Sequence, residues 1–220
     1  MSKEGEHGKL IASAAKAALV PLGCRRIGRS RTWLADQHFW AIVIEFQPSG
    51  FSKGSYLNVG ASWLWYAKES WSFDYGYRTE GFIEFENAMQ FAPEAERLAA
   101  LAAAEVVRFR EKFRSPPNIA RGLMVAINSN PWTVYHAAVA AGLVGDVAGS
   151  RQLFRRLIEQ AVTHDWEAKL KAASAALTEK LFDRATFVEA VLAIVEVSRA
   201  LHKLPPDPEC RDALTHRGSA

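Results

Sequence analysis

Two stretches between Phe39 and Trp65 alternate apolar with less apolar residues, and this period of two is typical of half-buried β-strands. The apolar positions of the first stretch, residues 39–47, are Trp40, Ile42, Ile44 and Phe46. Those of the second stretch, residues 56–65, are Leu57, Val59, Ala61, Trp63 and Trp65. The connector PSGFSKGS at 48–55 is rich in turn-forming residues, so we expect a hairpin with a long loop.

The pattern around this hairpin predicts a larger sheet with helices beside it. Apolar residues recur at helical spacing from residue 10 to residue 19, before the helix-ending Pro21 and Gly23. Residues 24–36 favour a strand but carry several arginines, which indicates an edge strand, and a last short strand is expected near 81–86. A helix should begin at Pro93 and end before the SPPN sequence at 115–118. These elements predict a mainly antiparallel sheet of four to five strands with flanking helices.

Strand signals stop after this helix, and helical periodicity returns from Pro131 to about Leu204. The stretch AAVAAGLVGDVAGSRQLFRRL at 137–157 resembles one tetratricopeptide-type helical hairpin, but the pattern does not repeat, so we expect a small bundle rather than a solenoid. The apolar residues from 187 to 197 predict a largely buried last helix. The chain should therefore form an α+β domain over 1–125, a helical subdomain over 126–204 and a flexible tail over 205–220.

Composition indicates where the protein is located, but it does not indicate a reaction. Lys and Arg exceed Asp and Glu by only 3, which is too small an excess to indicate a nucleic-acid or membrane surface by itself. Cys24 and Cys210 do not suggest a disulfide framework, and the N-terminus lacks the features of a secretory signal. The most apolar run, residues 98–107, is much shorter than the roughly 20 residues that a bilayer span needs. We expect a soluble, cytoplasmic protein that does not contact membranes.

The sequence lacks a recognisable catalytic or metal-binding constellation. His164 and Asp165, with His136 upstream, match no zinc signature, and the glycines of residues 50–55 lack the spacing of a phosphate-binding loop. Cys24 precedes two arginines, which can lower a thiol pKa, but no catalytic base accompanies it and a structural role is favoured. We therefore expect no catalytic residues, no metal and no cofactor.

One candidate site is the polar face of the predicted hairpin. The less apolar faces of the two strands bring together Glu45, Gln47, Asn58 and Ser62, with Arg26 on the neighbouring strand. A carboxylate beside amides and an arginine can act as a general base or hold a small substrate. The commoner explanation for such a group is a hydrogen-bond network within the fold.

A second candidate is an aromatic and basic surface formed by loops and strand edges. Its predicted members are Arg29, Arg31, Lys53, Trp71, Tyr75, Tyr77 and Arg78. Exposed aromatic residues beside arginines are typical of protein–protein hot spots. The arginines between residues 25 and 31 also allow a nucleic-acid contact, although arginines on an edge strand discourage edge-to-edge pairing without any ligand.

Three segments resemble a family of uncharacterised bacterial proteins, the DUF4304-like group. The resemblance covers about residues 21–87, and its most specific elements are Phe46-Gln47, Leu57-Asn58-Val59-Gly60 and the arginine-rich leader that ends at Trp33. Cys24 stands where the family usually has an aromatic residue. The resemblance implies an α+β domain without established enzymatic activity, and some such domains are associated with immunity and conflict systems.

The leading hypothesis is a non-enzymatic protein-binding module. Its sheet face and aromatic loops would contact a protein partner, and the helical half would add a second contact surface or a dimer interface. Two alternatives stay open: a small-molecule-binding protein or enzyme that uses the polar sheet face, and a nucleic-acid binder that uses the arginine cluster.

Overall fold

The structure is a computed structural model that describes residues 5–216, and its contacts divide these residues into two compact units. The first unit comprises residues up to 62 and residues 71–111, and the second comprises residues 63–70 and residues from 112 onward. The sequence predicts a single boundary at 125. In the structure the chain passes between the units three times, because residues 63–70 belong to the helical unit. This segment begins with Trp63, the last residue of a strand.

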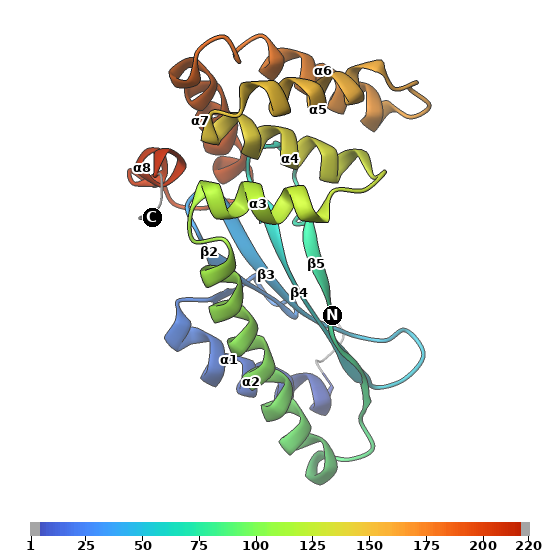
Figure 1. The fold of residues 1–220 in the computed structure, drawn as a ribbon. Coiled ribbons are helices and arrows are strands. Elements are labelled where there is room, and N and C mark those ends of the chain that lie inside the picture. Colours follow the sequence, from blue (N-terminus) through green and yellow to red (C-terminus); the bar gives the residue numbers. More distant parts are fainter. Residues whose placement is uncertain (1–4, 217–220) are drawn as a thin grey trace. The chain divides into compact units, whose positions relative to one another are not determined.

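The first unit holds a five-stranded antiparallel sheet with the simple order β1-β2-β3-β4-β5 (Figure 1). The strands are β1 (Arg25–Arg26), β2 (Thr32–Asp36), β3 (Trp40–Gln47), β4 (Gly54–Trp63) and β5 (Tyr75–Glu84). This confirms the predicted α+β fold with a mainly antiparallel sheet. Residues 24–36 form two short strands around a turn rather than one edge strand, since Gly28 has a positive φ of 51° and reverses the chain. The last strand begins at Tyr75, earlier than its alternation suggests.

Two helices pack on one face of this sheet, α1 (Glu6–Leu19) and α2 (Ala88–Lys112), and the short 3-10 helix η1 (Val20–Leu22) follows α1. The rings of Tyr75 and Tyr77 contact Phe109 of α2, and Arg97 of α2 forms an ion pair with Glu80 of β5. The core of the unit therefore lies between the sheet and these helices. Helix α2 begins at Ala88, before the predicted start at Pro93. Because Pro93 has no backbone N–H, one helical hydrogen bond is missing after the first turn.

The second unit contains α3 (Pro116–Ala126), α4 (Pro131–Val144), α5 (Val147–Glu159), α6 (Asp165–Thr178), α7 (Arg184–Leu201) and α8 (Cys210–Thr215). Helix α4 is central: it contacts α3, α5, α7 and α8, and every residue from Val134 to Leu143 is buried. A helix that is apolar on all sides is expected in such a position. The predicted burial of α7 is largely confirmed, since Phe187, Val191 and Val195 are fully buried, although Val197 is exposed.

The hairpin of α4 and α5 is held by small residues at the close approach of helices. Gly142 has no side chain, and a Cβ there would lie only 2.5 Å from the ring of Phe187 on α7. The Ser150 hydroxyl donates to the carbonyl of Ala138 at 2.8 Å. The hairpin predicted from residues 137–157 thus packs against α7 through a glycine that makes room for an aromatic ring.

The segment after β4 supplies aromatic core to the helical unit. Trp63 and Trp65 stack with ring centroids 4.9 Å apart and are fully buried. The Trp65 indole Nε1 donates to His136 Nδ1 at 2.9 Å, and the Tyr135 hydroxyl donates to the Trp65 carbonyl at 3.1 Å. Strand β4 therefore continues into a segment that is anchored to α4 by two buried hydrogen bonds.

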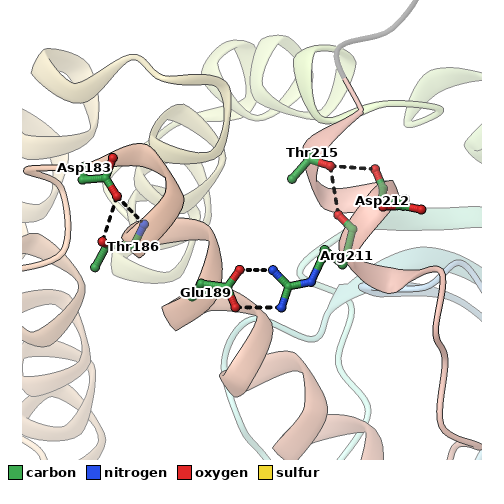
Figure 2. Close-up of polar contacts among 6 residues, drawn as sticks. All are labelled: Asp183, Thr186, Glu189, Arg211, Asp212 and Thr215. Carbon is green, nitrogen blue, oxygen red and sulfur yellow. Dashed lines mark hydrogen bonds and ion pairs between the residues drawn. The ribbon is translucent and has the colours of Figure 1, made fainter.

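The C-terminal region is ordered by specific contacts within this unit, where the sequence suggests a flexible tail. Arg211 of α8 forms a two-point ion pair with Glu189 of α7, and Asp183 caps α7 by accepting from Thr186 (Figure 2). The buried Arg199 guanidinium donates to the Pro205 carbonyl at 2.9 Å, which fixes the proline-rich connection. Leu214 of α8 is fully buried, so an amphipathic last turn ties down the residues up to 216.

Candidate interaction surface on the sheet

Four polar side chains meet on the sheet face opposite α1 and α2. Glu45 and Gln47 lie two residues apart on β3 and so share this face, and Asn58 of β4 is directly paired with Arg78 of β5. Tyr77, the neighbour of Arg78, points to the other face and contacts α2. We call Glu45, Gln47, Asn58 and Arg78 the polar ladder.

The ladder is held together by four hydrogen bonds across three strands. The Asn58 amide nitrogen donates to Glu45 Oε2 at 3.1 Å and to Gln47 Oε1 at 2.9 Å. Arg78 donates from Nη2 to Gln47 Oε1 at 3.0 Å and from Nε to Asn58 Oδ1 at 3.3 Å. Asn58 is therefore the centre of the ladder, because it uses both amide hydrogens and its oxygen within it.

The ladder leaves polar atoms available on its solvent side. Glu45 Oε1, Gln47 Nε2 and Arg78 Nη1 make no hydrogen bond to another side chain or backbone group among residues 5–216. The ladder does not contain an ion pair between Glu45 and Arg78, because the amides of Gln47 and Asn58 lie between them. It thus presents a carboxylate acceptor and amide and guanidinium donors whose positions are already fixed.

Aromatic rings flank the ladder at both ends. The Arg78 guanidinium lies over the Tyr56 ring, 4.0 Å from its centroid, and Tyr56 contacts Phe82 with centroids 5.1 Å apart. Gly60 and Gly76 pair directly across β4 and β5 at the other end. The Phe73 ring lies so close to them that a Cβ on Gly60 would approach it to 2.7 Å. Phe73 is still 40% exposed, so it covers bare backbone and presents one side to solvent.

The connection between β3 and β4 carries one more exposed ring. Phe51 is fully exposed, and the Ser49 hydroxyl accepts from the backbone nitrogens of Phe51 and Ser52, which gives the loop local order. Lys53 follows it and is also exposed. An exposed Phe in an ordered turn is unusual where no contact covers it, because its burial would be favourable.

Three hollows of the structure lie away from the ladder. Hollows of about 460, 350 and 410 Å³ lie between α1 and α2, beside Arg184 and beside Arg199, and none is lined by a residue of the ladder. Small-molecule sites are usually concave and bury most of their ligand. The ladder therefore lies outside these three hollows.

The predicted polar face is only partly assembled as expected. Glu45, Gln47 and Asn58 meet, but Ser62 is fully buried, with its hydroxyl 3.3 Å from that of Ser72. Arg26 turns back to the carbonyls of Ser30 and Arg29 and does not reach the ladder. Arg78 occupies the place assigned to Arg26.

The predicted aromatic and basic residues are spread over different surfaces. Arg31 bonds to His7 Nε2 and the Gly54 carbonyl, Arg29 lies exposed in a turn, and Lys53 lies in the β3–β4 loop. Tyr75 and Tyr77 pack on α2, on the face opposite Arg78, and Trp71 is half-buried. The sequence analysis did not select Tyr56, Phe73 or Phe51. The available signal for Phe73 was the pair Gly60 and Gly76, which leaves room for a ring over the backbone.

The cysteine and histidine residues that were considered as catalytic or metal-binding groups do not form such a site among residues 5–216. Burial raises the pKa of the Cys24 thiol, and the nearby Arg110 offsets this only in part, so the thiol is protonated at neutral pH. His136 is buried in α4, whereas His164 is exposed at the start of α6. Among residues 5–216, His, Cys, Asp and Glu side chains form no cluster of three that fits a metal ion.

No helix within the described range is both long and apolar enough to cross a bilayer. Comparisons of the chain with protein-family models, with curated proteins and with solved structures found no match. The resemblance of residues 21–87 to the DUF4304-like group therefore stays a prediction.

Proposed function

We propose that this protein is a non-enzymatic binding module that contacts a protein partner through the open face of its sheet. The observation that carries the proposal is the position of Arg78. Its guanidinium is stacked on Tyr56 and bonded to Gln47 and Asn58, so little side-chain freedom is left to lose on binding. Arginine and tyrosine in a fixed arrangement are typical of the centre of a protein interface.

The form of the surface supports a protein rather than a small molecule. The polar ladder is flanked by the partly exposed Tyr56 and Phe73, and the fully exposed Phe51 lies in the loop that joins β3 to β4. A mixture of apolar rings and satisfied polar groups is what protein interfaces contain, and their cores bury aromatic and arginine side chains preferentially. A partner that covers this face and the adjoining β3–β4 loop would bury Phe73 and Phe51.

The sheet face is a better contact surface than the sheet edge. Strand β5 is the last strand of the sheet, but its pairing with β4 contains two register shifts between Ser55 and Asn58. Bulges and charged residues are devices that prevent another strand from adding to an edge, and β5 carries Glu80, which is paired with Arg97. Strand addition to β5 is therefore disfavoured, and binding is assigned to the face.

The association of the DUF4304-like group with immunity and conflict systems would give such a module a cytoplasmic protein target. Two of the residues that carry the resemblance, Gln47 and Asn58, belong to the polar ladder. This part of the proposal rests on the resemblance alone.

Site-specific photocrosslinking tests the proposal even while the partner is unidentified. A photoreactive phenylalanine analogue is placed at Phe51, and in a control protein at Phe182, which is 75% exposed in the helical unit. In native-host lysate, the first protein should yield one stoichiometric crosslinked partner that the control lacks.

An arginine pair then links that partner to the sheet face. Arg78→Ala should abolish the crosslink from position 51, whereas Arg29→Ala should preserve it, because the exposed Arg29 side chain makes no hydrogen bond or ion pair with residues 5–216. A crosslink that survives Arg78→Ala, or identical products from positions 51 and 182, would refute binding through this face.

A further inference from the structure

Three aromatic rings from separate segments meet on the surface of the helical unit. Trp132 at the start of α4 stacks on Trp166 at the start of α6, with centroids 5.7 Å apart and an angle of 19°. Tyr66, from the segment after β4, packs edge-on against Trp132 with centroids 4.8 Å apart. We call Tyr66, Trp132 and Trp166 the aromatic ledge.

The ledge is exposed on one side and rigidly supported on the other. Trp166 is 38% exposed, and beside it Val162 in the α5–α6 connection is 46% exposed. Trp132 also stacks on the fully buried His136, which accepts the Trp65 indole hydrogen. Tyr66 packs edge-on against the buried Tyr135. The rings are therefore held in one arrangement before any ligand arrives.

The polar groups of the ledge are donors that the fold does not use. Neither indole Nε1–H of Trp132 and Trp166 nor the Tyr66 hydroxyl makes a hydrogen bond to any residue between 5 and 216. Tyrosine and tryptophan usually find a partner for these groups where they are packed. The nearby Glu167 is not such a partner, because its Oε2 accepts from Thr163 and from the His164 backbone.

A ligand that fits this surface has acceptors, few donors and apolar rings. A proline-rich segment in the polyproline II conformation meets all three conditions, because proline has no N–H and the backbone carbonyls of this helix make no internal hydrogen bonds. Its conformation is already restricted, so binding orders little additional chain. Tryptophan and tyrosine side chains are the usual contacts for such segments.

Ligands that stack on a ring face fit less well. Two rings already lie roughly parallel to Trp166: Trp132, with its centroid 5.7 Å away, and His164, with its centroid 6.5 Å away at an angle of 16°. A nucleobase or a sugar needs an open ring face. The hydrogen-bond donors of the ledge add a preference for a ligand with acceptors. We infer that the aromatic ledge is a binding site for a proline-rich extended peptide, separate from the sheet face.

The experiment titrates the full chain with an oligoproline peptide and follows the indole N–H signals by NMR. The signals of Trp132 and Trp166 should shift with a common saturation curve, and those of the buried Trp63 and Trp65 should not. Trp166→Ala should weaken binding by about tenfold or more, as expected for a hot-spot aromatic residue. Phe182→Ala, which removes another exposed ring of the same unit, should bind as the unchanged protein does.

Two further variants keep the test decisive. Trp132→Phe preserves a ring for packing but removes the indole donor, so it should weaken binding while the protein stays folded. Arg78→Ala should leave oligoproline binding unchanged, which makes this result independent of the sheet-face proposal. Unshifted Trp132 and Trp166 signals, full affinity in Trp166→Ala, or saturable binding of an oligosaccharide or oligonucleotide instead of oligoproline would each overturn the inference.

Discussion

Arg78 and Tyr56 lie on adjacent strands, and the guanidinium carbon of Arg78 is 4.0 Å from the centre of the Tyr56 ring. The same guanidinium donates to the side chains of Gln47 and Asn58. One arginine thus combines a cation–π contact with two hydrogen bonds, and it orders the polar ladder across three strands. Arg78 makes its contacts on an exposed face, so its effect on binding should exceed its effect on stability.

Replacement of Asn58 by alanine should destabilise the protein by about 1–2 kcal/mol, because the side chain supplies or accepts three of the four ladder hydrogen bonds on a half-buried surface. Urea unfolding measures the loss. A double-mutant cycle with Arg78→Ala should give a coupling of about 0.5 kcal/mol or more, since the two residues share a bond. Strict additivity would mean that the ladder does not act as a unit.

The substitution Gly76→Ala should destabilise the fold by about 1–3 kcal/mol. A Cβ at this position would lie 2.9 Å from the Gly60 Cα and from the Val59 carbonyl oxygen. Gly81 is a matched control on the same strand, since a Cβ there would meet nothing within 4 Å. Gly81→Ala should be neutral or slightly stabilising. Equal thermal unfolding temperatures for the two variants would contradict the close pairing of Gly60 and Gly76.

Conversion of Trp65 to phenylalanine should cost about 1–3 kcal/mol, because buried His136 would lose its indole donor. Since His136 accepts through Nδ1, the neutral ring carries its proton on Nε2. The loss can be measured by chemical unfolding, with Trp166→Phe as a surface control that should change stability by less than about 0.5 kcal/mol. A similar cost for both variants would argue against the buried bond.

These contacts show which parts of the structure local sequence patterns can predict. Alternation correctly grouped Glu45, Gln47 and Asn58, because side-chain direction in a regular strand depends only on position. It assigned Arg78 to the aromatic and basic surface instead of this group, since the pairing of β5 contains two register shifts and its turn-rich sequence shows no period of two. The ladder residues of β3 and β4 can therefore be predicted from alternation, whereas Arg78 of β5 can be placed only from the pairing of the strands.

Contacts between distant segments were beyond such patterns. Trp65 reads as an apolar position of a strand, and nothing near it in the sequence indicates that it bonds to His136, 71 residues later. The aromatic ledge likewise needs Tyr66, Trp132 and Trp166 to come from three segments. The two-unit division has the same cause, since residues 63–70 join the helical unit through these long-range contacts.

Lys203 offers a direct route to a more stable protein. It follows α7 with a positive φ of 53°, the Leu204 nitrogen bonds to the Arg199 carbonyl and the Lys203 nitrogen bonds to the Ala200 carbonyl. The same helix-ending motif after α4 uses Gly145, with a φ of 87°. Lys203→Gly should therefore stabilise the protein by about 1 kcal/mol, because glycine adopts this conformation without steric cost.

The reverse substitution provides the control. Gly145→Ala should destabilise the protein by about 1 kcal/mol, since its backbone conformation is unfavourable for any residue with a Cβ. Both changes can be followed as shifts of the urea midpoint at constant slope. A loss of stability in Lys203→Gly would show that the lysine side chain contributes more than its backbone strain removes.

Acid should weaken the fold through His202, the residue just before Lys203. Burial, together with the positive charge of Lys68, lowers the pKa of His202 below its ordinary value of 6.5. The unfolded chain then binds more protons than the folded chain between 6.5 and the lower folded pKa, so stability must fall as the pH falls through this range. Below the folded pKa the histidine is protonated in both states, and its contribution to the slope ends.

The comparison of two proteins isolates this contribution from that of other groups. Unfolding free energies measured by urea titration from pH 7.5 downward should show a smaller loss for His202→Gln than for the unchanged chain, whatever their difference at neutral pH. Lys68→Met should make the loss smaller and end it at a higher pH, because removal of a nearby positive charge raises the folded-state pKa of His202 toward 6.5. Parallel pH profiles for the unchanged chain and His202→Gln would place the acid sensitivity in another group.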